Sequence, residues 1–279
     1  MAYHHICVKP FAGALGAEVS GVDLAALPEA ALNDIRVAWL RHLVLLFRDQ
    51  SLTSSQYLAF ARRIGEPVEY PLLRGLPDYP LIVPVIKQPH ECVNFGGLWH
   101  SDTAYLDAPP VGATLLAREV PPVGGDTLFA NMYLAYEALS HGMRGLLDGL
   151  RAVNTSVKAD VTRTREDRLS DAGARRRPDA AFEAVHPVVR THPQTGRKLL
   201  YVNYGHTVRF EGMTEDESAP LLQYLFTHLA RPEFTCRVRW QVGTLALWDN
   251  RCTQHNPIND YSGHRRVMHR ISLGAERPR

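Results

Sequence analysis

The feature that most restricts the fold of this chain is a series of short apolar runs separated by proline and glycine. The 279 residues include 19 prolines and 20 glycines. Runs of this kind, rich in β-branched residues and bounded by turn residues, are typical of strands. We assign strands to residues 42–47, 81–86, 114–118, 127–130, 185–191, 198–202, 235–240, 244–248 and 266–273. Many short strands with few helices predict a mainly β domain with flanking helices, built as a sandwich or barrel.

Helical periodicity is confined to a few segments. Apolar residues recur at helical spacing in residues 28–40, 53–64, 132–150 and 215–229. The second of these helices is expected to begin at Thr53 or Ser54 as the N-cap and to end at Gly65.

Residues 154–182 are polar, rich in arginine and poor in apolar periodicity. We interpret them as a long insertion within a single domain that covers residues 1–279. Because long loops in compact domains often close over a site, this segment is also a candidate lid. It contains the densest basic run, residues 175–177, which is typical of a solvated loop.

Composition excludes several classes of function. The formal net charge is +2 and no long basic block occurs, so neither nucleic acid nor an anionic membrane is expected as a partner. No stretch reaches the roughly 18 to 20 apolar residues of a membrane span, and residues 1–10 lack the apolar core of a signal peptide. The cysteines are scattered without a CxxC pair, which argues against a zinc-thiolate site or a disulfide framework. We therefore expect a soluble cytoplasmic protein.

The first chemical signal is the triplet His100-Ser101-Asp102. On an extended segment, residues i and i+2 point to the same side, so the imidazole of His100 and the carboxylate of Asp102 can converge on one ion. Such triplets also arise by chance in a chain with 13 histidines and 29 acidic residues. The flanking residues distinguish this triplet from a surface pair. Two glycines and a tryptophan precede it in residues 96–99, and Tyr105 follows it.

A third ligand is needed, and His255 is the best candidate. It follows an apolar strand at residues 245–248 and a short polar turn. Two histidines and one carboxylate on one face of an ion leave open positions, which is the arrangement of non-haem iron(II) oxygenases. Zinc accepts the same ligands, so the choice of metal depends on whether the chain also holds a chelating keto acid.

The last strand supplies an anion-binding pair. Arg266 and Arg270 alternate with Val267 and His269, so both guanidinium groups project to one face. Two arginines directed into a cavity are unfavourable unless anions meet them, and the planar guanidinium suits bidentate recognition of a carboxylate. An exposed edge strand with solvated arginines is the alternative. The position of this strand shortly after His255 favours a keto-acid site.

The chain also carries six ordered motifs around these residues. They are LGAEVSGVDL at 15–24, WHSD at 99–102, GGDT at 124–127, HPVVRTHP at 186–193, WDNRCTQH at 248–255 and RRVMHR at 265–270. Together they resemble the taurine dioxygenase / 2,4-dichlorophenoxyacetate dioxygenase (TauD/TfdA) family of iron(II)- and 2-oxoglutarate-dependent dioxygenases, over residues 5–275. Six motifs in family-like order are far more specific than any one of them.

The resemblance implies a double-stranded β-helix core (jelly roll, cupin-like) with helices packed outside, in a homo-oligomer that is a dimer or a tetramer. It implies His100, Asp102 and His255 as the iron ligands that form the catalytic centre. Arg266 would hold the distal carboxylate of the cosubstrate 2-oxoglutarate, with help from the Thr127 hydroxyl.

The resemblance also implies the reaction. With iron(II) and O₂, 2-oxoglutarate yields succinate and CO₂ while a small anionic organic substrate is hydroxylated, often with cleavage of the product. Arg270 would meet the anionic end of that substrate, and Trp248 would pack near the metal. Taurine enzymes carry a histidine where this chain has Tyr70 in the substrate site. This departure favours an aryloxyalkanoate-like carboxylate over an alkyl sulfonate or sulfate such as taurine.

Other polar residues in these motifs are expected to be structural rather than metal-bound. They are Asp126, His186, His192, Asp249, Asn250 and His269. Asp249 and Asn250 should satisfy backbone groups in the turn before His255. His269 should lie on the face of its strand opposite the arginines.

Two other interpretations use the same ligand set. A non-catalytic cupin-like binding protein would keep the fold but would be expected to lack a ligand or one of the arginines, and all are present. A zinc hydrolase would need a general base such as a glutamate adjoining a ligand, and neither His100 nor His255 adjoins one.

Overall fold

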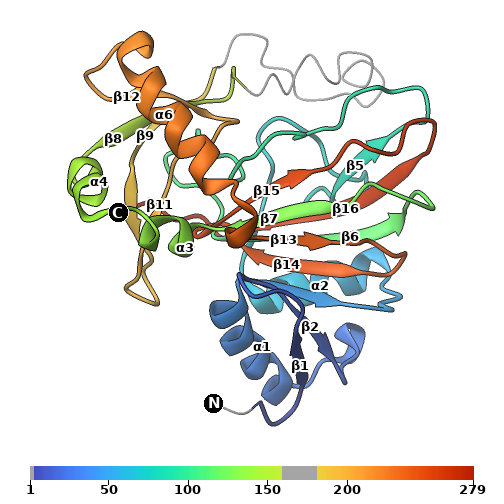
Figure 1. Ribbon diagram of the computed structural model, residues 1–279. Coiled ribbons are helices and arrows are strands. Elements are labelled where there is room, and N and C mark those ends of the chain that lie inside the picture. Colours follow the sequence, from blue (N-terminus) through green and yellow to red (C-terminus); the bar gives the residue numbers. More distant parts are fainter. Residues whose placement is uncertain (1–2, 159–180) are drawn as a thin grey trace.

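The computed structural model describes residues 3–158 and 181–279, which are built around two packed β-sheets (Figure 1). The larger sheet has eight strands in the order β1-β2-β3-β14-β6-β16-β4, with β5 also paired to β16. These strands are β1 (Cys7–Pro10), β2 (Ala17–Ser20), β3 (Val44–Phe47), β14 (Leu245–Asp249), β6 (Gly112–Glu119), β16 (Arg266–Leu273), β4 (Pro67–Val68) and β5 (Val83–Lys87). The smaller sheet contains, in order, β13 (Thr235–Val238), β7 (Thr127–Asn131) and β15 (Thr253–Pro257).

The main hydrophobic core lies between the two sheets. Successive side chains of a strand point to opposite faces, and β3 shows the consequence. Val44 and Leu46 join the inner cluster together with Phe129 of the smaller sheet, whereas Leu45 and Phe47 belong to a second cluster on the outer face. Two facing, largely antiparallel sheets form the jelly-roll core, so the mainly β prediction is confirmed.

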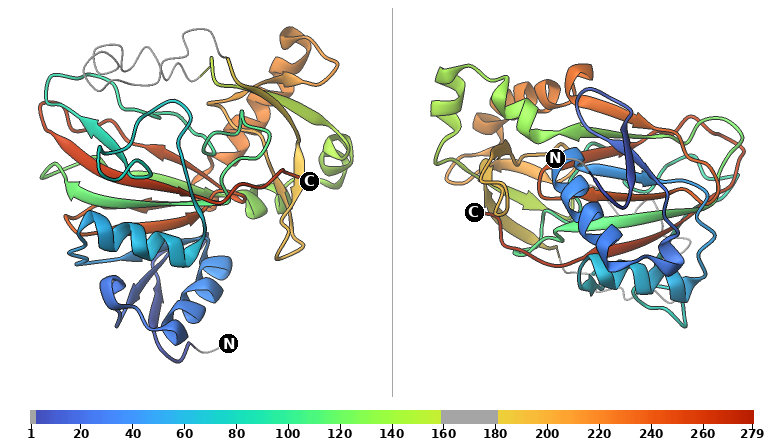
Figure 2. Two further views of the ribbon diagram at one scale, coloured as in Figure 1. Left: turned by 180° about the vertical axis from the view of Figure 1, so that it is seen from behind. Right: turned by 90° about the horizontal axis from the view of Figure 1, so that it is seen from below.

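Helices α1 (Glu29–His42) and α2 (Ser54–Ile64) cover the outer face of the larger sheet (Figure 1, Figure 2). Leu32 and Ile35 of α1 and Tyr57 of α2 are buried in the outer cluster. The start of α2 follows the predicted signal, since the Thr53 side chain and Gln56 form a capping box.

A further group of elements lies at one end of the sandwich, on the left in Figure 1. It contains β8 (Arg151–Thr155), β9 (Glu183–Pro187), β12 (Thr207–Phe210), β10 (Val189–Thr191), β11 (Lys198–Leu200), α3 (Met132–Glu137), α4 (His141–Leu147) and α6 (Glu215–Leu229). The short 3-10 helices are η1 (Leu24–Ala26) and η2 (Pro232–Phe234). Leu222, Leu225 and Leu229 of α6 extend the inner core at this end. Among the described residues, no helix has the length and apolar character needed to cross a bilayer.

The structure corrects the prediction of one helix at residues 132–150. Two short helices, α3 and α4, occupy this range instead. Ser140 lies between them, and its hydroxyl accepts a 3.2 Å hydrogen bond from the Met143 N–H as the N-cap of α4. A side-chain cap starts a new helix here, although the apolar spacing continues across it.

Several strands lie outside the predicted ranges, namely β1, β2, β4, β8, β12 and β15. The sequence of β15 is largely polar, and its pairing with β7 is what makes it a strand. Asn154 and Thr155, where the predicted insertion begins, belong to β8. Most of that insertion, residues 159–180, lies outside the described residues.

Candidate active site

The structure brings the three predicted ligands together between the two sheets. The Nε2 atom of His100 lies 3.5 Å from Oδ1 of Asp102, and Nε2 of His255 lies 3.6 Å from the same oxygen. One donor atom from each residue lies within 4.8 Å of the others. The side chains of His100, Asp102 and His255 are 12%, 1% and 10% exposed, so the group is shielded from bulk water.

Backbone pairing holds the two histidines side by side. The His100 N–H donates to the His255 carbonyl at 3.1 Å, and the His255 N–H donates to the His100 carbonyl at 2.9 Å. His255 lies on β15, whereas His100 forms an isolated bridge and Asp102 already lies in a turn. The extended geometry predicted for the triplet therefore ends at Ser101, and tertiary contacts must place Asp102.

The protonation states suit a divalent cation. Burial, with help from His100, lowers the pKa of His255 to about 3, so its imidazole is neutral near pH 7. Burial opposes ionisation of Asp102, but Arg270 and the histidines outweigh it and hold the carboxyl pKa well below its usual range. His100 donates from Nδ1 to the Leu98 carbonyl at 2.7 Å, which leaves the Nε2 lone pair free for an ion. Two imidazole nitrogens and one carboxylate form a donor set for iron(II) or zinc.

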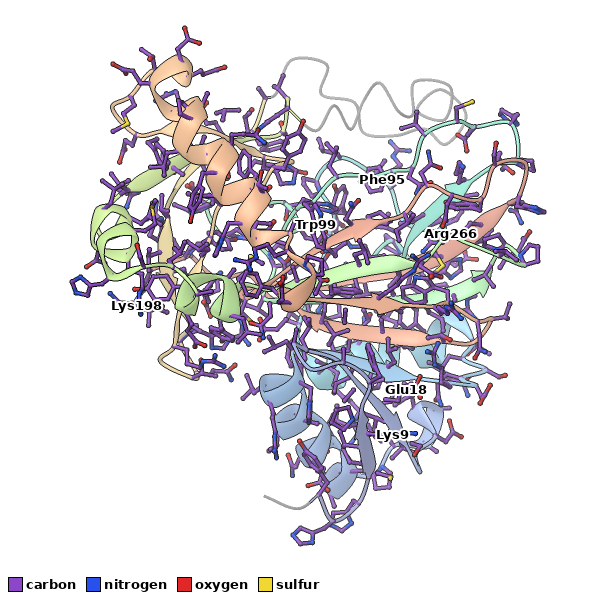
Figure 3. The ribbon with its side chains drawn as sticks, in the orientation of Figure 1. Lys9, Glu18, Phe95, Trp99, Lys198 and Arg266 are labelled. Atoms are coloured by element: carbon purple, nitrogen blue, oxygen red, sulfur yellow. The ribbon has the colours of Figure 1, made fainter. Side chains whose placement is uncertain are left out.

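A narrow cavity of about 50 Å³ lies beside His255 and is also lined by Thr127. Arg266 and Arg270 both line it and are each 6% exposed, which confirms that their side chains share the inner face of β16. Figure 3 shows Arg266 on β16 and Phe95 on the loop drawn above it, and Phe95 also lines the cavity.

Arg266 offers unpaired donors to this cavity. Its Nε and Nη2 atoms are buried and have no hydrogen-bond partner among the described residues. Burial lowers the pKa of its guanidinium, an unfavourable effect that a bound anion would offset. The Thr127 hydroxyl oxygen accepts a 3.0 Å hydrogen bond from Trp240 Nε1, so its own proton can be donated to a ligand. This arrangement fits a bound carboxylate.

Arg270 lies between the cluster of His100, Asp102 and His255 and a second cavity. Its Nη2 atom is 2.8 Å from Oδ2 of Asp102, and its guanidinium lies 5.3 Å from the centre of the Tyr70 ring. Its Nε atom is buried and has no hydrogen-bond partner among the described residues. Arg270 can therefore hold Asp102 in place and still donate to an anion.

The second cavity is larger, at about 240 Å³, and is lined by His100 and Asp102 of this cluster. Its lining residues are Tyr70, Val93, Asn94, Phe95, Gly96, Gly97, Leu98, His100, Asp102, Thr103, Gly205, His206, Asn259 and Arg270. Asp102 is the only acidic residue among them. The described lining of the larger cavity thus combines the Arg270 guanidinium, the Asp102 carboxylate, several neutral polar groups and an apolar wall.

His206 is a site residue that the sequence did not predict. Its ring centre lies 5.9 Å from that of His100 and 4.9 Å from that of Tyr105. Burial, with a contribution from His100, lowers its pKa to about 3, so it presents a neutral imidazole to the larger cavity. No motif marks it, because its position depends on how the loop between β11 and β12 packs.

Two residues expected to be structural are hydrogen-bonded to arginine side chains. Asp126 accepts a 2.6 Å hydrogen bond from Arg237. His269 faces away from the arginine face of β16 and accepts a 3.2 Å hydrogen bond from Arg118 Nε.

His192, Asp249 and Cys252 form a second compact group of potential donor atoms. Asp249 is already engaged, because Arg251 donates to its two oxygens at 2.8 and 2.6 Å and His192 Nε2 lies 3.1 Å from Oδ2. Burial keeps the pKa of the Cys252 thiol well above its usual range. This group is a buried ion-pair network, which agrees with the structural role expected for His192 and Asp249.

Gly96 lines both cavities and has a left-handed backbone with φ of 68°. A Cβ atom at this position would lie 3.1 Å from Cε1 of His100. We expect Gly96→Ala to displace the imidazole and to weaken divalent-metal binding by about 10-fold or more, as measured by anaerobic Co(II) titration. Gly97→Ala is the control, since its Cβ would meet nothing closer than 3.4 Å. If both variants weakened metal binding equally, the effect would come from a change in the loop and not from displacement of the His100 ring.

Comparison with known proteins gives a consistent result. The family model described as "Taurine catabolism dioxygenase TauD, TfdA family" matches residues 8–272. An alpha-ketoglutarate-dependent sulfate ester dioxygenase of Pseudomonas putida is 34% identical, over 97% of this chain and 90% of the relative. An (S)-phenoxypropionate/alpha-ketoglutarate-dioxygenase of Sphingobium herbicidovorans is 33% identical, over 94% and 92%. A solved taurine dioxygenase from Burkholderia xenovorans has a TM-score of 0.82 and is 34% identical to this chain. The match covers 99% of this chain and 91% of the solved one.

Proposed function

Because this chain belongs to the TauD, TfdA family of dioxygenases, we propose that its buried centre binds iron(II) and, with 2-oxoglutarate and O₂, oxidises a small organic anion. The reaction class is that of an alpha-ketoglutarate-dependent dioxygenase, an oxidoreductase, and the resemblance seen in the sequence motifs is confirmed. The observation that carries the proposal is the convergence of His100, Asp102 and His255 beside a cavity in which two buried nitrogens of Arg266 have no hydrogen-bond partner among the described residues.

Each residue has a proposed role at this centre. His100, Asp102 and His255 would hold iron(II), which together with 2-oxoglutarate supplies the O₂-dependent oxidation. Arg266 would bind the distal carboxylate of 2-oxoglutarate through its free donors, and Thr127 would donate to the same carboxylate. A fork-shaped, charge-assisted pair in a buried cavity fixes orientation as well as affinity.

We propose that Arg270 holds the anionic end of the primary substrate in the larger cavity. Two observations support this role: its Nε atom has no hydrogen-bond partner in the described part of the chain, and it lies beside Asp102. Val93, Phe95 and Leu98 would pack against an apolar body. Since Asp102 is the only acidic residue in the described lining and already faces Arg270, a substrate ammonium group would meet no available carboxylate. The larger cavity therefore favours an apolar anion over an amino-substituted one such as taurine.

Tyr70 supports a further choice within that class. Its hydroxyl lies 3.4 Å from that of Tyr105, and its ring lies against Arg270. An aromatic ring at this position would pack against an aryl group next to the anion site. We favour an aryloxyalkanoate-like carboxylate, with alkyl sulfates and sulfonates as the second choice. The relatives do not decide between them, because those named for phenoxypropionate and for sulfate esters are about equally similar to this chain.

Substrate-dependent succinate formation tests this choice. Aryloxyalkanoates, alkyl sulfates and taurine would be compared with the iron(II)-loaded enzyme, 2-oxoglutarate and O₂. We expect aryloxyalkanoates to give the strongest coupling and taurine the weakest. Taurine coupling as strong as that of aryloxyalkanoates would contradict the argument from Tyr70 and from the lining of the larger cavity.

The metal and cosubstrate have a separate test. Anaerobic addition of iron(II) and 2-oxoglutarate is expected to produce a weak visible metal-to-ligand charge-transfer band. Its absence from intact protein would favour a zinc hydrolase or a non-catalytic binding protein, neither of which finds support among the relatives.

We also propose that the enzyme is a cytoplasmic homo-oligomer, either a dimer or a tetramer. Light scattering coupled to size-exclusion chromatography measures the oligomeric state directly. A monomer of 31.2 kDa at micromolar concentration would contradict it.

A further inference from the structure

The two segments that carry the metal ligands are joined by a short series of hydrogen bonds. Residues 100–102 belong to the loop before β6, and residues 250–255 form the turn and strand after β14. Besides the mutual backbone bonds of His100 and His255, the Ser101 hydroxyl donates to the Thr253 carbonyl at 3.0 Å. The remaining link comes from a single buried amide.

That amide belongs to Asn250, which contacts the backbone of Asp102 at two points. Its Oδ1 atom accepts a 2.7 Å hydrogen bond from the Asp102 N–H, and its Nδ2 atom donates to the Asp102 carbonyl at 3.2 Å. Nδ2 also donates to the Pro110 carbonyl at 2.9 Å. These bonds go to a distant segment rather than to the turn before His255, which was the expectation from sequence. With only 1% of its surface exposed, Asn250 is fixed in this position.

Asp102 needs such a support because it does not lie in a strand. It begins a turn, and the next residue, Thr103, has φ of 47°, an uncommon conformation for a residue other than glycine. The chain therefore bends away immediately after the ligand. The side chain must nevertheless present Oδ1 between two imidazoles, and a small rotation of this peptide would move that oxygen out of reach.

We propose that Asn250 is a positioning residue for the metal centre, which sets Asp102 in place relative to His255. This inference rests on the proposed function, because it presumes that these residues bind iron(II). Asn250 lies in the same turn that leads into His255, so one amide ties the carboxylate ligand to the segment that carries a histidine ligand. Its neighbour Asp249 is engaged by Arg251 and His192 instead, and within the described chain its side chain makes no hydrogen bond to residues 100–102.

The test compares metal affinity with fold stability in two variants of Asn250. Asn250→Ala removes all three hydrogen bonds. Asn250→Asp keeps the size and the acceptor for the Asp102 N–H but loses both donors. We expect each variant to bind Co(II), as measured by anaerobic titration of the metal-free protein, about 10- to 100-fold more weakly than the unmodified chain.

Asn131→Ala is the matched control. Asn131 is also buried, and it also makes three hydrogen bonds, with Ala14, Tyr133 and Leu134, but none of them involves a ligand segment. It should lower the melting temperature of the metal-free protein and leave Co(II) affinity unchanged. Unchanged affinity in a folded Asn250 variant, or equal weakening in Asn131→Ala, would overturn the positioning role. Failure of the unmodified chain to bind Co(II) would instead overturn the proposed metal centre.

Discussion

Asp102→Asn is expected to abolish both metal binding and turnover. Asparagine keeps the size of the side chain but removes the charge, and Oδ1 of Asp102 is the atom that both imidazoles approach, at 3.5 and 3.6 Å. Loss of a partner outside the ligand set typically weakens metal binding about 10- to 100-fold, so loss of the only anionic ligand should exceed that range. Succinate formation should fall by about 1,000-fold or more, because the metal that activates O₂ would no longer be held. Each tenfold loss corresponds to about 1.4 kcal/mol. Anaerobic Co(II) titration and a succinate assay measure the two effects.

Asp107→Asn is the control for this substitution. Asp107 lies five positions further along the same loop, but its side chain is 80% exposed and its contact with Arg277 is long, at 3.7 Å. An exposed pair of this kind contributes about 0–1 kcal/mol, so metal affinity and turnover should match those of the unmodified chain. Retention of normal Co(II) affinity by Asp102→Asn would mean that the ligand set is assigned wrongly.

Features that depend on local spacing could be predicted from the sequence. The two-residue period of β16 predicts that Arg266 and Arg270 share a face, and they line the same cavity. The capping signal at Thr53 predicts the start of α2, and it forms as expected. In both cases the information lies within a few residues, so no knowledge of the tertiary structure is needed.

Features that depend on pairing between distant segments could not be predicted in this way. β15 carries His255, but its largely polar sequence has no strand signal, and β7 makes it a strand by hydrogen bonding. The turn at Asp102 and its support by Asn250 likewise arise only when two distant segments meet. His206 joins the site because a loop folds over it. The residues that meet at this centre could therefore be predicted from the sequence, whereas the contacts that orient them could not.

Arg266→Ala is expected to raise the dissociation constant of 2-oxoglutarate by roughly 30- to 4,000-fold. Removing one partner of a buried, hydrogen-bonded charge pair typically costs about 2–5 kcal/mol, and each 1.4 kcal/mol is tenfold. The affinity for the primary substrate should change far less, because Arg266 lines the narrow cavity and is absent from the lining of the larger one. Anaerobic titration of the iron(II)-loaded enzyme with 2-oxoglutarate, followed by the visible band, gives the first quantity. Substrate-dependent succinate formation gives the second.

The adjacent residue provides a matched control for this experiment. Arg265 is 42% exposed and pairs with Glu119 at the surface, so Arg265→Ala removes the same side chain from the same strand end without touching the narrow cavity. It should leave 2-oxoglutarate affinity unchanged. Arg266→Lys keeps the charge but loses the planar fork, so its affinity should fall between those of the unmodified chain and Arg266→Ala. The contradicting result is that Arg266→Ala weakens the binding of 2-oxoglutarate and of the primary substrate by the same factor. That result would mean that the guanidinium stabilises the whole site and does not bind the distal carboxylate.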